Sequence, residues 1–231
     1  MTHDATVTYP SYLQLDKILT AQAPVAPASL GSSVHASEQF FIVVHQAFEL
    51  WFKQLLTDLD CAREALLAQP RDPERALDHL QRVAAIERLL VQQMVLFDHL
   101  SLRSFLAFRP YLGTASGSES RQWREVQKAL GLRGQDSSPI YQALAAAVDA
   151  AGLSMLDVYR DPSAAGVLYR LAEALVDIAN LFWQLTAVHV QVAERAIGER
   201  PGTGGTSGVP YLREALQVKA FPELWKVRTQ L

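Results

Sequence analysis

Apolar residues recur at intervals of three and four along almost the whole chain, and the alternation of period two that marks half-buried strands is nearly absent. This spacing places apolar side chains on one face of an α-helix, so it predicts an all-α fold. The segments predicted to be helical are residues 12–22, 37–69, 72–99, 120–132, 139–151 and 162–198, and a last helix from about residue 211. Proline and glycine separate these helices, most densely in ERPGTGGTSGVP at residues 199–210.

Local signals indicate where two of these helices begin. Ser37 is expected to be the N-cap of the first long helix, because serine side chains accept hydrogen bonds from free backbone N–H groups. Pro73 is expected in the first turn of the next helix, the position at which proline is tolerated. Residues 100–117 and 131–136 are expected to be irregular, because glycine and proline interrupt the first segment and glycines the second.

Size and charge limit the function classes. The 231 residues can bury a sizeable core as one domain, 1–231, with a short N-terminal arm at 1–22. The net charge is −3 and the basic residues are scattered, which disfavours a nucleic-acid partner or an anionic membrane. No signal-peptide pattern opens the chain, and polar residues interrupt its longest apolar stretch. We therefore expect a cytoplasmic protein that binds neither nucleic acid nor membrane.

Two features exclude common site chemistries. Cys61 is the single cysteine, which excludes an internal disulfide and any cysteine-clustered zinc or iron–sulfur site. It lies in an apolar helical pattern, so a buried and inert thiol is expected. The glycine-rich segment 199–210 lacks Gly-Lys-Ser/Thr and follows a helix instead of a strand, so it is not a phosphate-binding loop.

The six histidines are the main titratable candidates. Four are expected to face solvent or to lie in loops and chain ends: His3, His35, His79 and His99. His45 and His189 lie within strongly apolar helices instead, where a lone histidine is usually a satisfied core residue. A pair of them on separate long helices favours a cofactor cavity, because one imidazole can bind haem iron while the other faces the opposite side of the ring. Phe41, Phe48 and Phe52 share the helix face of His45.

Four motifs occur in order over most of the chain. They are YPSYLQLD at residues 9–16, FFIVVHQAFELWFKQLL at 40–56, FRPYLGTASG at 108–117, and HVQVAERAIGERPGTGGTSGVPY at 189–211. Together they resemble the tryptophan 2,3-dioxygenase family, in which they are the N-terminal YxxYLxLD segment, the signature helix, the FRxxLGxxSG segment and the haem-ligand helix with its GTGG loop.

The resemblance implies a helical bundle around one haem b and assigns roles to ten residues. His189 matches the axial ligand of the haem iron, and His45 matches the distal histidine that contacts the substrate indole N–H. Arg109 matches the partner of the substrate carboxylate, for which a guanidinium is well shaped. The other matches are Thr203 at the ammonium and carboxylate end, Ser116 near the haem edge, Phe41 in the pocket wall, and Tyr9, Tyr12 and Leu13, which reach a neighbouring subunit's pocket. Phe105 takes the substrate-binding position at which the family usually has a tyrosine that bonds the carboxylate.

The implied activity is oxygenation of L-tryptophan or a substituted tryptophan by dioxygen, opening the indole C2–C3 bond to an N-formylkynurenine-type product. A homo-oligomer, either a dimer or a homotetramer built as a dimer of dimers, is also implied. The sequence departs from the family pattern at Phe105, where a tyrosine is usual, in the triplet Ala36-Ser37-Glu38, in SGSES at residues 116–120, and in a shortened segment between Arg109 and His189.

These departures leave three alternatives open. A divergent member could insert a single oxygen atom into an indole amino acid, giving an oxindole or a hydroxylated product. The chain could instead be a haem-binding sensor or carrier without turnover, although Arg109 and Thr203 argue against this because a sensor needs no amino-acid clamp. The last alternative is a haem-free helical interaction domain.

Overall fold

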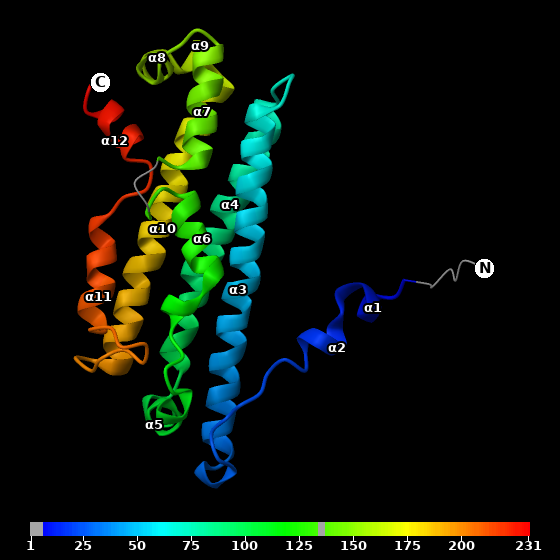
Figure 1. Ribbon diagram of the computed structural model, residues 1–231, viewed down its shortest axis with the longest axis vertical. Coiled ribbons are helices and arrows are strands. Elements are labelled where there is room, and N and C mark those ends of the chain that lie inside the picture. The colour runs from blue at the N-terminus through cyan, green and yellow to red at the C-terminus, as the bar shows by residue number, and fades with distance from the viewer. Residues whose placement is uncertain (1–6, 134–136) are drawn as a thin grey trace.

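The structure is a computed structural model that describes residues 7–133 and 137–231. Within these ranges all regular structure is helical and no strand occurs, so the all-α prediction is confirmed. Three long helices lie side by side: α3 (Ser32–Leu67), α4 (Pro73–Met94) and α10 (Val167–Ile197), with α4 and α10 running opposite to α3 (Figure 1). Two shorter helices, α6 (Arg121–Ala129) and α7 (Pro139–Ala150), pack against α3.

Short helices cap the two ends of this bundle. One end carries α5 (Leu102–Phe108), which is followed by η3 (Arg109–Leu112) and η4 (Gly117–Glu119), and the opposite end carries α8 (Met155–Arg160), α9 (Pro162–Ala165) and α12 (Pro222–Arg228) (Figure 1). Helix α11 (Val209–Glu214) packs along the side of α10. The remaining elements are α1 (Tyr9–Leu13), α2 (Leu15–Ile18), η1 (Ala28–Leu30), η2 (Val95–His99) and η5 (Ala215–Gln217).

Helix α10 is the apolar centre of the bundle. It is the one helix in the described part of the chain that is long and apolar enough to cross a membrane, and 56% of its most apolar stretch is buried inside the fold. Leu171, Leu175 and Ile178 on this helix are completely inaccessible to solvent. Helix α10 packs against α4 and α7, and burial in these contacts explains why so many of its residues are apolar.

The helix starts agree with local capping signals in one case and differ in the other. Pro73 occupies the first turn of α4 as predicted, and the Asp72 carboxylate accepts a hydrogen bond from the backbone N–H of Arg75. Helix α3 begins five residues before the predicted start, so the predicted N-cap at Ser37 is wrong. The Ser37 hydroxyl donates to the Ser33 carbonyl inside the helix. His35, predicted in a loop, lies in the first turns of the same helix.

Helices predicted as continuous are broken at residues with positive φ. The predicted helix at 12–22 is two short helices, because Gln14 has φ 52° between them. The predicted helix at 162–198 divides at Gly166 (φ 55°) into α9 and α10. The last helix begins at Val209 instead of residue 211 and is followed by a separate α12. Segment 100–117 was predicted to be irregular, and this prediction missed α5. The predicted irregular segment 131–136 lies partly outside the described residues.

A buried polar cluster joins α3 to α4 and corrects the prediction that His79 is solvent-facing. Asp58 is 1% exposed, and its carboxylate accepts hydrogen bonds from Nδ1 of His79 at 2.7 Å and from the Gln54 amide at 2.8 Å. A buried carboxylate requires such partners, so His79 is a structural residue here. Cys61, predicted to be buried, is only partly buried.

The N-terminal arm leaves the bundle beside the start of α3, and its two short helices lie away from the long helices (Figure 1). The Glu38 carboxylate, 1% exposed, accepts hydrogen bonds from the backbone N–H groups of Val25 (2.7 Å) and Ala26 (3.1 Å). This buried contact fixes the point from which the arm departs.

Candidate functional site

His45 and His189 come together from two different long helices, α3 and α10. Burial, with a smaller contribution from the nearby His45, lowers the pKa of the His189 imidazole to about 4. Within residues 7–133 and 137–231, no hydrogen bond to the His189 ring is found. His189 is thus a neutral imidazole with free ring nitrogens, the form in which histidine binds a metal.

The His45 ring is oriented by its own helix. Its Nδ1 lies 2.8 Å from the carbonyl oxygen of Phe41, so Nδ1–H donates this bond and Nε2 is left as the free nitrogen. Burial lowers the pKa of His45, while the Phe41 carbonyl and the negative charge of Glu49 oppose this shift. At neutral pH the ring is therefore expected to be uncharged, with Nε2 able to accept a hydrogen bond.

Phenylalanine rings surround His45 on one side. The ring centroid of Phe41 lies 4.1 Å from that of His45, and the Phe97 centroid lies at 5.4 Å. Phe105 is 6.0 Å from Phe41, and Phe108 lies 5.4 Å from Phe105. Phe41 and Phe97 are therefore neighbours of the His45 ring, and Phe105 and Phe108 extend the same wall behind Phe41, a surface that suits a flat aromatic molecule.

His45, Phe48 and Phe52 share one face of α3, but they pack in two different regions of the protein. Phe48 and Phe52 pack against each other, and Phe52 lies 5.3 Å from Trp123 of α6, within the main core. The common face of these residues thus contributes to two regions: Phe41 and His45 to the site, and Phe48 and Phe52 to the core.

The glycine-rich loop at 201–208 lies directly on the segment at 109–116. The Arg109 Nη2 donates to the Pro201 carbonyl at 2.7 Å, and the Thr203 hydroxyl donates to the Ala115 carbonyl at 2.5 Å. Gly204 approaches Ser116 so closely that a Cβ on Gly204 would lie 2.6 Å from the Ser116 Cβ. This explains why glycine is needed there, and it brings the three predicted residues Arg109, Thr203 and Ser116 together.

Ser116 lies in a short capped turn. Its hydroxyl accepts a hydrogen bond from the backbone N–H of Ser118, and the Glu119 carboxylate accepts one from the backbone N–H of Ser116 at 3.0 Å. The unusual SGSES segment therefore forms a capping box, in which the Glu119 charge is bound to its own turn.

The arm residues stand apart from this group. Tyr9 and Tyr12 are 73% and 76% exposed, and Leu13 is partly exposed. Their helix α1 lies away from the bundle (Figure 1). The fold of one chain thus leaves the two aromatic side chains free to contact another molecule.

Several residues that line this region were missed in the sequence. Phe97 lies in the 3-10 turn η2, inside the segment 72–99 predicted as one helix, and was not singled out there, while Phe108 was noted only as part of a motif. The carbonyl groups of Ala115 and Pro201 are backbone atoms, which residue types do not reveal. The tight approach of Gly204 to Ser116 could have been suspected from the density of glycines alone.

These features define a class: an all-α protein with two histidines from different long helices, an aromatic wall beside one of them, and an arginine and a threonine where a glycine-rich loop docks on segment 109–116. Comparison with known proteins narrows the class further. The family model of tryptophan 2,3-dioxygenase matches residues 1–145 and 141–231. The chain belongs to the tryptophan 2,3-dioxygenase family.

Curated relatives agree over nearly the whole chain. A tryptophan 2,3-dioxygenase of Cupriavidus necator is 37% identical, with 97% of this chain and 88% of that protein covered. Those of Caulobacter vibrioides and Bacillus cereus are each 34% identical over 97% of this chain, with 98% and 93% of their own lengths covered.

The shortened middle of the chain can also be placed. The alignments extend over 268 residues, more than the 231 of this chain, so the relatives carry additional residues. The two segments matched by the family model meet at residues 141–145, at the start of α7. This junction lies within α7, on the chain segment that separates Arg109 from His189.

Proposed function

We propose that this chain is a haem-dependent dioxygenase that opens the indole C2–C3 bond of L-tryptophan or a substituted tryptophan, giving an N-formylkynurenine-type product. Membership in the tryptophan 2,3-dioxygenase family supports this activity. The observation that carries the assignment to these residues is the occurrence of two neutral histidines, His45 and His189, on two different long helices, with a phenylalanine wall beside His45.

The residues fit a haem held by His189. This imidazole is neutral because its pKa is lowered to about 4, and its ring nitrogens are free of hydrogen bonds to the described residues, so one can bind iron without first losing a proton. When bound there, the haem supplies redox-active iron for the activation of dioxygen. The partly buried ring and its apolar neighbours limit the access of water to this group.

His45 then positions the indole. With Nδ1–H bound to the Phe41 carbonyl, Nε2 is the acceptor available to the indole N–H of the substrate. Phe41 and Phe105 provide the apolar surface against which the indole packs. The role of these residues is orientation, which holds the substrate in a reactive geometry, and His45 does not need to remove a proton.

Arg109 and Thr203 bind the amino-acid end of the substrate. Arg109 gives one Nη2–H bond to the Pro201 carbonyl and keeps further donors for a carboxylate. Thr203 is held beside it by the bond to the Ala115 carbonyl, so both side chains are ordered before substrate binds. Ser116 lies against Gly204 of the same loop, and the family resemblance assigns it to the edge of the haem that would bind here.

The remaining proposals concern the whole protein. We infer a single domain over residues 1–231 that acts in the cytoplasm as a homo-oligomer, either a dimer or a dimer-of-dimers tetramer. The exposed Tyr9 and Tyr12 with the partly exposed Leu13 support the inference that the arm reaches the pocket of a neighbouring subunit.

A product assay tests the reaction. Ferrous holoprotein is mixed without oxygen with L-tryptophan, and one equivalent of dioxygen is then added. We expect the absorbance of N-formylkynurenine and a product that contains two added oxygen atoms. One observation favours a second outcome: Phe105 supplies no hydroxyl at the amino-acid end. A product with a single added oxygen atom and no N-formylkynurenine absorbance would establish monooxygenation instead.

A further inference from the structure

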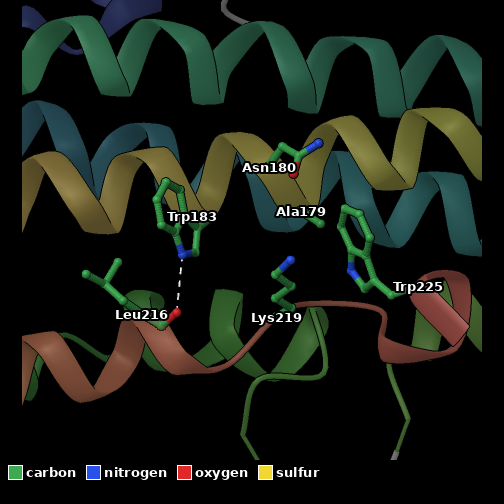
Figure 2. Close-up of a pocket in the computed structure, with 6 residues that line it drawn as sticks. All are labelled: Ala179, Asn180, Trp183, Leu216, Lys219 and Trp225. Carbon is green, nitrogen blue, oxygen red and sulfur yellow. Dashed lines mark hydrogen bonds between the residues drawn. The ribbon is translucent and has the colours of Figure 1, made fainter. Parts of the chain in front are cut away.

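A separate hollow of about 440 Å³ lies on the outer side of α10, where the C-terminal segment passes over the helix (Figure 2). Its lining residues are Ala179, Asn180 and Trp183 from α10, and Leu216, Lys219 and Trp225 from the C-terminal segment. None of them belongs to the group around His45 and His189. The hollow is therefore not a part of the proposed oxygenase site, and it is large enough for a small aromatic molecule.

Both indole rings in this hollow are fixed by the main chain. The Trp183 Nε1–H donates to the Leu216 carbonyl at 3.2 Å, and the Trp225 Nε1–H donates to the Ala220 carbonyl at 2.9 Å. Because the ring N–H groups are already bound, the rings offer mainly apolar faces to a ligand. Trp183 is nevertheless 43% exposed, which leaves a large and rigid aromatic surface in contact with water.

A single positive charge lies between the two rings (Figure 2). The Lys219 ammonium is 4.7 Å from the centroid of the Trp225 ring, a cation–π contact that holds the charge near the indole. Among the described residues that line the hollow, Lys219 is the only cation and none is acidic. The Asn180 side chain adds a polar amide at its edge.

We propose that this hollow is a second, non-catalytic binding site for a planar aromatic monocarboxylate. The aromatic ring of the ligand packs on the faces of Trp183 and Trp225, and its carboxylate accepts a charge-assisted hydrogen bond from Lys219. A zwitterionic amino acid brings an ammonium group close to Lys219, with no acidic lining residue to compensate. Aromatic acids without an ammonium group are therefore expected to bind more tightly than L-tryptophan, the reverse of the preference at Arg109 and Thr203.

Fluorine NMR of the holoprotein tests this site directly. The four tryptophans are replaced biosynthetically by 5-fluorotryptophan, and each resonance is assigned with a Trp→Phe variant. The protein is titrated with indole-3-acetate, without oxygen and with the histidine site saturated by L-tryptophan. We expect the resonances of Trp183 and Trp225 to shift, those of Trp51 and Trp123 to stay in place, and a Kd on the order of 0.1–1 mM for a ligand of this size.

Substitutions of Lys219 distinguish the effect of its positive charge on ligand binding from the effect of its packing. Lys219→Met is expected to weaken binding at least tenfold, because the charge-assisted bond is lost, and Lys219→Arg is expected to retain it. Lys226→Met, an exposed position on α12, removes the same charge nearby and is expected to leave the Kd unchanged.

Three results would overturn the proposal. They are resonances of Trp183 and Trp225 that do not move, a Lys219→Met protein that binds as tightly as the parent, and a separate L-tryptophan titration in which these two resonances give a Kd equal to or below that of indole-3-acetate. None of these results depends on turnover, so a failure here is distinguishable from a failure of the proposed dioxygenase activity.

Discussion

The imidazole of His189 is kept neutral by burial, with a pKa lowered to about 4, and its ring nitrogens have no partner among the described residues. We expect His189→Ala to lose stable haem binding, because no other histidine among the described residues combines this lowered pKa with a place on an apolar core helix. Haem content measured from the Soret absorbance after reconstitution checks this. His99→Ala, an exposed change at the end of η2, is the control and should bind haem fully. A fully loaded His189→Ala protein would contradict the assignment.

Arg109 donates a hydrogen bond to the Pro201 carbonyl and is proposed to bind the substrate carboxylate. Arg109→Ala is expected to weaken substrate binding by about 1.5–3 kcal/mol, a roughly 10- to 150-fold increase in KM with a smaller change in kcat. Steady-state kinetics with L-tryptophan measure this, and Arg103→Ala on the exposed side of α5 is the matched control. An unchanged KM would mean that the substrate carboxylate binds elsewhere.

At the scale of elements, the docking of the glycine-rich loop on segment 109–116 decides whether Arg109 and Thr203 lie side by side. Gly204→Ala places a Cβ 2.6 Å from the Ser116 Cβ, so the loop must move. We expect KM for L-tryptophan to rise by at least a few-fold, because ordered donors are displaced. Gly117→Ala meets no atom within 4 Å and serves as the control. Equal kinetics for both variants would show that the loop position does not matter for binding.

Much of the helical framework could be predicted from sequence, because helical periodicity and proline are local signals. The start of α4 is an example, since Asp72 and Pro73 act on their own first turn. Ser37 misled for the opposite reason: tertiary contacts extended α3 by a further turn, and the serine then bonded within the helix. The breaks at Gln14 and Gly166 depend on positive φ angles. Glycine permits a positive φ without requiring it, and glutamine rarely adopts one, so neither residue type predicts the break.

The candidate site was predictable to a similar degree. His45 and His189 stand out because polar rings are unusual in such apolar helices, and the motifs point to Arg109, Ser116 and Thr203. The wall residue Phe97 and the backbone carbonyls at Ala115 and Pro201 were not predictable, because their roles arise only when distant segments meet. Sequence patterns report which face of an element is apolar, and they do not report which loops touch.

At the scale of the whole molecule, pH acts on the stability of the bundle through groups whose pKa values burial shifts in opposite directions. Burial lowers the pKa of His189 to about 4, so in the haem-free protein its contribution to stability is present above the unfolded value of 6.5 and is lost as the pH falls. Glu87 on α4 behaves in the reverse manner. It is 1% exposed, its Oε2 has no hydrogen-bond partner among the described residues, and burial raises its pKa well above 4.5.

The raised pKa of Glu87 gives a prediction for the unfolding free energy. The proton is bound more tightly in the folded state, so the stabilisation is fully present below pH 4.5 and is lost as the pH rises through the folded pKa. Glu87→Gln carries no such proton. In urea unfolding above pH 6.5, away from the histidine effect, we expect the variant to gain stability relative to the parent, by up to about 1.4 kcal/mol per pH unit until the folded pKa is passed. Glu64→Gln, an exposed carboxyl on α3, should show no such slope, and a pH-independent difference for Glu87→Gln would mean that Glu87 finds water or a partner in the folded protein.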